Sequence, residues 1–256
     1  MKKFLTALFV SVFSFASANA ELISVGVSGN IGMLSADGTE KITGTSQRDV
    51  VWGENSAGNR ASGTSASSTT KGSEDLMIGY VNVFSELHIF DSGLRVGASY
   101  VPYAMDSQTT ENVRNDGCSG GENIESTTCT TTTNKVDVTL EELVSVYLAF
   151  HKDVDSRFIS SAFIKAGMMQ AKLNTNEVLA SGSSYGNTDL KGEFFGLGLE
   201  KKIADQGVFV RIEGHVTTFN NITLTNKNTD AHENTNTIEV KGLDGATALL
   251  SIGKSF

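Results

Sequence analysis

Basic residues, cysteines and long hydrophobic runs are scarce in this chain of 256 residues. Lys and Arg number 20 against 29 Asp and Glu, so the formal net charge is −9. This acidic balance argues against nucleic acid as a partner, because phosphate contacts need clustered Lys and Arg. Hydrophobic residues make up 39% of the chain, which is too many for a disordered protein. The length fits one all-β domain or two small domains.

The first 20 residues have the pattern of a secretory signal peptide. Lys2 and Lys3 precede an apolar run over 4–15, and residues 18–20 (Ala-Asn-Ala) form a small-x-small cleavage site. An N-terminal membrane anchor is the alternative, but the run is shorter than the ~20 residues a spanning helix needs. We predict a mature chain of 21–256 with 18 basic and 29 acidic residues, a net charge of −11.

The mature chain alternates apolar and polar residues with a period of two, which is typical of strands with two different faces. Eight segments show this pattern, at 22–34, 75–90, 94–105, 136–151, 158–173, 190–201, 208–220 and 245–256. In the fourth segment, Glu142 interrupts an apolar face that includes Leu140 and Val144. We expect Glu142 to lie near a membrane rim.

The connections between these segments alternate in length. Those after the second, fourth and sixth segments are short, whereas the others run over about 35–74, 106–135, 174–189 and 221–244. The long connections are rich in Ser, Thr, Asn and Gly and have too few apolar residues to form a core. Short turns on one rim and long loops on the other are the plan of an outer-membrane barrel.

Cys118 and Cys129 are the two cysteines. An exported chain meets an oxidising compartment, so we predict a disulfide that closes the second long loop. A metal site is the weaker interpretation, because two thiolates without a nearby His supply half of a zinc site. We therefore predict neither a metal nor a cofactor.

A soluble barrel alternates in the same way as a membrane barrel, with its apolar face directed inward. Two features favour the membrane barrel besides the loop lengths. The polar face is rich in Gly and Ser with few charges, whereas a water-facing exterior carries many more. The chain also ends in Phe256, on an alternating last segment.

A terminal Phe on an alternating strand resembles the assembly signal of bacterial outer-membrane barrels. The arrangement as a whole resembles the small eight-stranded family of OmpA-type transmembrane domains and opacity-type surface proteins. This resemblance covers the mature chain and implies an all-β fold, an eight-stranded antiparallel up-and-down transmembrane β-barrel. It implies a location in the bacterial cell outer membrane, with outer-membrane lipid and the barrel assembly machinery as partners. No family-specific catalytic or binding motif accompanies it.

Charged and imidazole side chains on the polar face are expected to form a network in the lumen. Its predicted members are Glu86, His88, Arg95, Glu141, Lys165, Glu200, Arg211, Glu213 and His215. An interior plug of ion pairs is favoured over an ion-selective constriction, because eight strands leave an interior that side chains can fill.

Aromatic residues near the strand ends are expected to form two girdles at the membrane surfaces. The predicted outer girdle contains Tyr100, Tyr103 and Phe219, and the inner one Phe150, Phe158, Phe209 and Phe256.

No residue supports catalysis strongly, and we predict that the protein is not an enzyme. A hydrolase would need an activated Ser or Thr beside its His, directed at lipid, whereas the alternation directs His215 and Thr217 inward. Two functions remain: a structural or surface-interaction role through the loops, or a narrow channel for small solutes or ions. No extracellular ligand can be named.

Overall fold

The computed structural model describes residues 22–44, 66–106, 110–120, 127–178, 184–203, 207–226 and 235–256. The predicted signal peptide lies outside the described residues. Within the described residues, no helix is long and apolar enough to cross a membrane.

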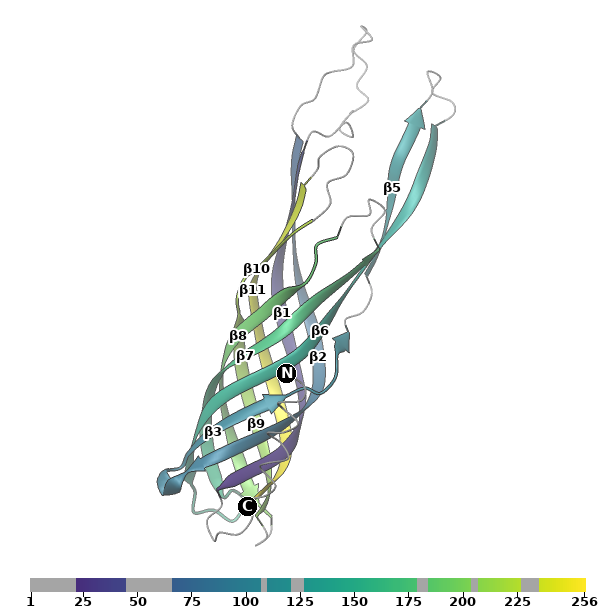
Figure 1. Ribbon diagram of the computed structural model, residues 1–256. Coiled ribbons are helices and arrows are strands. Elements are labelled where there is room, and N and C mark those ends of the chain that lie inside the picture. Colours follow the sequence, from purple (N-terminus) through teal and green to yellow (C-terminus); the bar gives the residue numbers. More distant parts are fainter. Residues whose placement is uncertain are drawn as a thin grey trace.

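Antiparallel strands form a closed ring (Figure 1). The strands are β1 (Ile23–Gly44), β2 (Ala66–Ile89), β3 (Leu94–Tyr100), β4 (Met105–Asp106), β5 (Thr110–Gly120), β6 (Thr127–Asp153), β7 (Ser161–Val178), β8 (Thr188–Lys202), β9 (Val208–Phe219), β10 (Ile222–Thr225) and β11 (Thr235–Ser255). The ring runs β1-β2-β3-β6-β7-β8-β9-β11 and closes because β11 pairs with β1. β4 and β5 also pair with β6, and β10 pairs with β11. This ring confirms the predicted eight-stranded antiparallel barrel.

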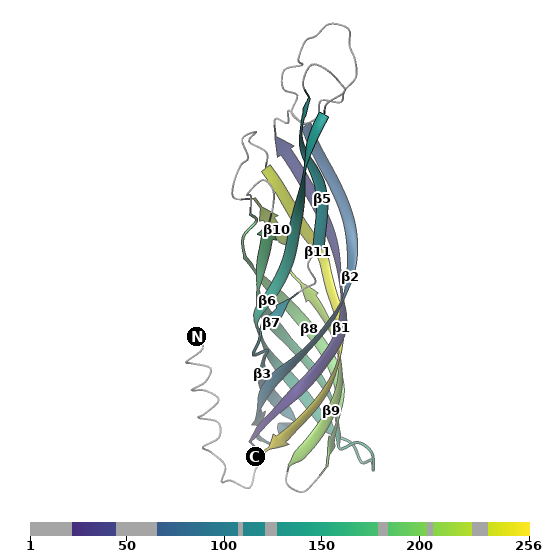
Figure 2. The same cartoon turned by 90° about the vertical axis from the view of Figure 1, so that its right-hand side faces the viewer.

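One end of the barrel, the short-turn end, carries the tight connections and both ends of the described chain. The N–H of Leu22 donates to the carbonyl of Phe256 at 2.7 Å, which joins the first strand to the last (Figure 2). The 3₁₀ turn η1 (Phe90–Ser92) leads into Gly93, which has a φ of 75°. A Cβ atom at Gly93 would lie 2.2 Å from the carbonyl oxygen of His151, so this turn requires glycine.

At the opposite, long-loop end, the strands extend further than the sequence pattern predicts. β1 and β2 stay paired from Ser35–Asp75 to Gly44–Ala66, and β5 and β6 form a ladder from Thr110–Val136 to Gly120–Thr127. Figure 1 shows both ladders rising beyond the barrel. These segments are polar on both faces, so they show no alternation, yet their Thr residues favour extended backbone. Parts of the predicted loops 35–74 and 106–135 are therefore strand.

The two cysteines lie in the β5–β6 ladder. The backbone of Cys118 is directly opposite that of Cys129. Directly opposed residues of antiparallel strands have Cα atoms about 4.5–5.5 Å apart, within the range that a disulfide spans. Their side chains lie outside the described part of the structure, so the disulfide stays a prediction.

Large apolar side chains form a band on the outside of the barrel. Leu197, Ile212 and Leu250 are each at least 60% exposed, whereas Ser24, Ser28 and Ser251 on the inner face are buried. The band ends at Met33 on β1 and Met77 on β2, above which the outward residues are polar. Backbone groups that face hydrocarbon must be satisfied internally, and a closed ring does this. An exposed apolar band on a closed ring with a polar interior is the architecture of a transmembrane β-barrel of the outer-membrane type.

The structure corrects two of the predicted girdle residues. Phe209 is fully buried inside the barrel, and Phe219 packs against an interior apolar cluster. In contrast, Phe150, Phe158 and Tyr103 are exposed on the outside.

Candidate functional site

The interior of the barrel is organised around Arg211 on β9. Its terminal nitrogens donate to the two carboxylate oxygens of Glu86 on β2, each at 2.7 Å. Its Nε donates to Glu200 Oε2 on β8, also at 2.7 Å. A bidentate pair of this kind fixes the geometry of both side chains. Arg211 therefore connects strands on opposite sides of the ring.

Two further side chains complete this cluster. Arg95 on β3 donates to Glu200 at 3.2 Å and to Glu86 at 3.4 Å. The hydroxyl of Tyr147 on β6 donates to Glu86 at 3.0 Å. The two carboxylates are thus shared between two guanidinium groups.

A second cluster lies beside the first. Lys165 Nζ on β7 donates to Glu213 Oε2, and the same oxygen lies 3.0 Å from His215 Nε2. Lys165 also lies 4.4 Å from the centroid of the Tyr147 ring. Tyr147 therefore contacts both clusters, which together are called the lumen network: Glu86, Arg95, Tyr147, Lys165, Glu200, Arg211, Glu213 and His215.

The lumen network is buried and balanced in charge. It contains three carboxylic and three basic side chains, with side-chain exposures of at most 10% for the paired Glu, Arg and Lys residues. The guanidinium of Arg211 also lies 4.4 Å from the ring centroid of Phe209. A buried charge is costly unless it is paired, and here each is paired.

The network contains seven of the nine predicted lumen residues; His88 and Glu141 are elsewhere. His88 Nε2 lies 2.7 Å from Ser24 Oγ near the short-turn end, and that hydroxyl also contacts Ser255 at 2.8 Å. Glu141 pairs in register with Lys172 near the long-loop end. Sequence reasoning missed Tyr147 as a member of the network, although it shares the inward face of Ser145 and His151.

His151 is a buried imidazole outside the network. Its Nδ1 lies 3.3 Å from Ser161 Oγ, and its ring stacks on Phe163 at a centroid distance of 4.4 Å. Its Nε2 has no hydrogen-bond partner among the described residues.

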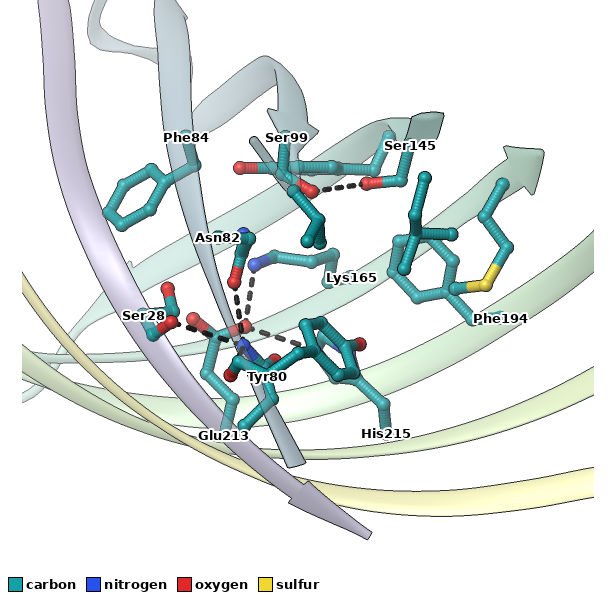
Figure 3. A pocket seen from close by; sticks show the side chains of 15 residues that line it. Ser28, Tyr80, Asn82, Phe84, Ser99, Ser145, Lys165, Phe194, Glu213 and His215 are labelled. Atoms are coloured by element: carbon teal, nitrogen blue, oxygen red, sulfur yellow. Dashed lines mark hydrogen bonds and ion pairs between the residues drawn. The ribbon is translucent and has the colours of Figure 1, made fainter. Parts of the chain in front are cut away.

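A cavity of about 40 Å³ lies above the first cluster, beside Lys165, Glu213 and His215 (Figure 3). This is room for a few water molecules. Its walls combine polar side chains, such as the Asn30–Asn82 pair, with the rings of Tyr80 and Phe194. Figure 3 shows Lys165 and His215 approaching Glu213 at one side of the cavity.

Towards the long-loop end the interior becomes apolar. Leu190, Ile222 and Leu243 are at most 6% exposed and form a buried cluster. Partly buried residues pack against it, namely Leu34, Ala36, Leu140, Leu173, Phe219, Leu224 and Val240. This set is called the apolar cap.

Two β-bulges bring residues into the apolar cap. On β6 the register shifts between Glu141 and Val144, where Glu142 has a φ of 54°. Because β6 has one extra residue at this point, the alternation of inward and outward side chains is reversed on its N-terminal side. Leu140 therefore contacts the apolar cap. The sequence pattern placed Leu140 on the outer face with Val144, and that prediction is wrong. Glu142 pairs with Lys172 at 2.8 Å on the outside.

The second bulge lies on β11. The register shifts between Ser35 and Asp37 of β1, and the extra residue is at Gly242, which has a φ of 57°. Below it Leu249 and Ser251 point inward, and above it Val240 does. Both bulges therefore lie near the boundary between the polar lumen and the apolar cap.

Among the described residues, no group of three or more His, Cys, Asp or Glu side chains could hold a metal ion.

Comparison with known protein families finds no match, and comparison with curated proteins finds none. Among solved structures, the chain is similar to Ail, the attachment invasion locus protein of Yersinia pestis, at 12% identity and a TM-score of 0.28, over 89% of this chain and 99% of Ail. It is also similar to the outer membrane protease OmpT of Escherichia coli, at 8% identity and a TM-score of 0.35, over 90% of this chain and 97% of OmpT. A FadL homologue of Pseudomonas aeruginosa gives 8% identity and a TM-score of 0.31, over 92% of this chain and 90% of the other. These are outer-membrane β-barrels, and at such values no activity or residue role is carried over.

Proposed function

We propose that this protein is a closed outer-membrane barrel that presents its long-loop end to the outside of the cell for surface interaction. The apolar band supports the membrane part of this proposal. The ladders β1–β2 and β5–β6 support the surface part, since they extend beyond the band and are polar. At about 3.3 Å per residue, the stretch of β1 from Leu34 to Gly44 extends about 36 Å along the strand.

The observation that carries the proposal is the filled interior. An ion that crosses the barrel has to separate the paired charges of Arg211, Glu86 and Glu200, which are almost completely buried. It then has to pass the apolar cap, whose described members are all apolar side chains and cannot replace the ion's water. Both barriers oppose conduction, so the barrel acts as a rigid platform.

A narrow channel is the second candidate, and the cavity beside Lys165 and Glu213 is the observation that favours it. Water in this cavity would shorten the dehydrated path. The channel still requires the apolar cap to open.

Single-channel recording of the refolded mature chain (21–256) in a planar bilayer separates the two functions. Boiled and unboiled samples that differ in electrophoretic mobility confirm that the barrel has folded. We expect folded barrels without discrete conductance steps, also when Lys241, an exposed residue above the apolar band, is changed to Ala as a control. Reproducible steps that change amplitude in Arg211→Gln would overturn the closed platform and support the channel.

The C-terminal residue is the proposed assembly signal. The backbone of Phe256 is bonded to Ile23 in both directions, and its ring lies 4.9 Å from Lys254 Nζ. The barrel assembly machinery and outer-membrane lipid remain the proposed partners for insertion. His215 is assigned to the lumen network rather than to catalysis, because its Nε2 contacts Glu213 and its ring stacks on Phe194.

A further inference from the structure

One edge of β2 has no neighbouring strand over much of its length. β3 pairs with β2 only from Val83–Tyr100 to Ile89–Leu94. Pro102 follows β3, and a proline cannot donate to a strand ladder. Among the described residues, no strand pairs with this edge of β2 above Val83, although β1 stays paired with the other edge up to Ala66.

A second edge also has no strand partner among the described residues. β4 and β5 occupy the place of β3 in the ring, but they pair only with β6 among the described strands. Figure 1 shows the β5–β6 ladder diverging from the β1–β2 ladder. The edge of β2 over residues 66–82 and the outer edge of β4–β5, neither of which has a partner among the described strands, are together called the notch.

The backbone of β2 can accept a strand in the notch. The N–H of Val81 points towards the notch, because it donates to the hydroxyl of Tyr103 at 2.6 Å. N–H groups of alternate residues point to the same side of a strand, so those of Gly79, Met77 and Ser73 also face the notch. A row of such groups is a template for an added strand.

The charge of the long-loop end indicates which strand would be added. The segments 35–76, 106–142, 172–193 and 220–244 contain 21 acidic and 10 basic residues, which accounts for the whole net charge of the mature chain. The lumen and the short-turn end are each balanced. The two sides of the notch contain five acidic residues and two basic ones: Glu74, Asp75, Asp106, Glu111 and Asp116 against Lys71 and Arg114.

A second copy of this chain fits the notch poorly. Two copies in one membrane are related by an axis along the membrane normal, so their β2 strands would run parallel and in register. Lys71 would then lie opposite Lys71 and Asp75 opposite Asp75, and like charges in direct opposition destabilise a sheet.

We propose that the notch binds an extended, Lys- or Arg-rich polypeptide segment by strand addition to β2. This proposal rests on the proposed function, because it requires the long-loop end to face outside the cell. It specifies the partner: backbone hydrogen bonds supply the pairing, and the acidic surface supplies selection by charge.

Three labelled peptides test the proposal against the folded barrel in zwitterionic micelles. The first alternates Lys and Thr over about twelve residues, enough to pair along the notch. The second keeps every Lys but replaces alternate Thr residues with Pro, and the third replaces Lys with Glu. Fluorescence anisotropy should show binding of the first peptide, which weakens as salt is added. We expect the second and third to bind at least about tenfold more weakly.

Substitutions in β2 locate the site. Ser73→Pro removes an N–H that faces the notch and leaves the ladder with β1 intact, so it should weaken the first peptide about tenfold. Ser73→Ala is the matched control and should bind as the unaltered chain does. Hydrogen exchange should show added protection at the amides of Gly79 and Met77 with the first peptide.

Each unfavourable outcome is distinct. If the Pro-containing peptide binds as tightly as the first peptide, strand addition is overturned and only charge attraction is left. The same holds if Ser73→Pro binds the first peptide as tightly as the unaltered chain does. Equal binding of the Glu peptide would overturn selection by charge, and no binding of any peptide would overturn the proposal altogether. The conductance of the same barrels is independent of these results, so failure of the closed platform is recognised separately.

Discussion

β11 shows how the barrel differs between its two ends. Towards the short-turn end, Leu250 and Ile252 point outward and are about 60% exposed, whereas Ser251 points inward. Above Gly242 the order is reversed: Val240 packs into the apolar cap, and Lys241 pairs with Glu239 on the exposed side at 2.7 Å. One strand thus has a membrane-type pattern below the bulge and a water-type pattern above it.

This reversal follows from the solvent on each side. In hydrocarbon an apolar exterior costs nothing, so the polar side chains are collected inside and must satisfy one another. In water the apolar side chains gain by burial, as in any soluble protein. The part of the barrel towards the short-turn end, called the lower region, is therefore held together by the paired charges of the lumen network. The part towards the long-loop end, called the upper region, is held together by the small hydrophobic core of the apolar cap.

The largest effect is expected where the lower region loses a charge. Arg211→Met leaves Glu86 and Glu200 buried without their main partner, and the free energy of unfolding should fall by about 3–5 kcal/mol. Urea unfolding of the refolded barrel, followed by circular dichroism or gel mobility, measures this. Lys241→Ala breaks an exposed pair and should change stability by less than about 1 kcal/mol. Similar losses in both variants would contradict the contrast between the two regions.

The upper region should respond to the loss of apolar volume. Leu190→Ala removes a side chain that is 3% exposed from the apolar cap, and a loss of about 2–5 kcal/mol is expected. Leu76→Ala is the control, since Leu76 is 50% exposed and should tolerate truncation. The same unfolding assay compares them. If Leu190→Ala is no more damaging than Leu76→Ala, the cap is not a core.

The outer surface should distinguish the regions by their tolerance of charge. Leu250→Arg places a cation in the middle of the apolar band and should destabilise the inserted barrel by about 2–4 kcal/mol. Thr69→Arg, on the exposed part of β2 above the band, should have almost no effect. Folding into lipid vesicles measures both. Equal tolerance at the two positions would mean that the band does not face lipid.

The sequence predicts the lower region well, because its alternation is strong and its charges are few. On β2, β8 and β9 the apolar residues point outward, so the residues that alternate with them point into the lumen. These inward residues include Glu86, Glu200 and Arg211, which the barrel brings together. Their pairing distances and the part played by Tyr147 could not be predicted, since they depend on strand tilt and stagger.

The upper region was harder to predict. Polar ladders such as β1–β2 above Met33 show no alternation of apolar and polar residues, so the sequence pattern predicts strands that are too short. The apolar cap had a signal in the sequence: Leu34 ends a face of β1 that otherwise consists of Ser, Gly and Asn residues. The alternation predicts the wrong face for Leu140, because the bulge at Glu142 shifts the strand by one residue and no apolar residue in the sequence marks that shift.

The bulge at Gly242 should have the smallest effect, yet it tests how the two patterns are joined. Its φ of 57° is left-handed, and a Cβ there would lie no closer than 3.5 Å to Asp37 Oδ2, so backbone conformation and not space opposes a side chain. Gly242→Ala should therefore lower the free energy of unfolding by about 1–2 kcal/mol. Gly242→Asn should cost less, because Asn tolerates this conformation, and Gly214→Ala should be near neutral, because its Cβ would meet no atom within 4 Å. Equal losses for Ala and Asn would show that the bulge is held by something other than the left-handed residue.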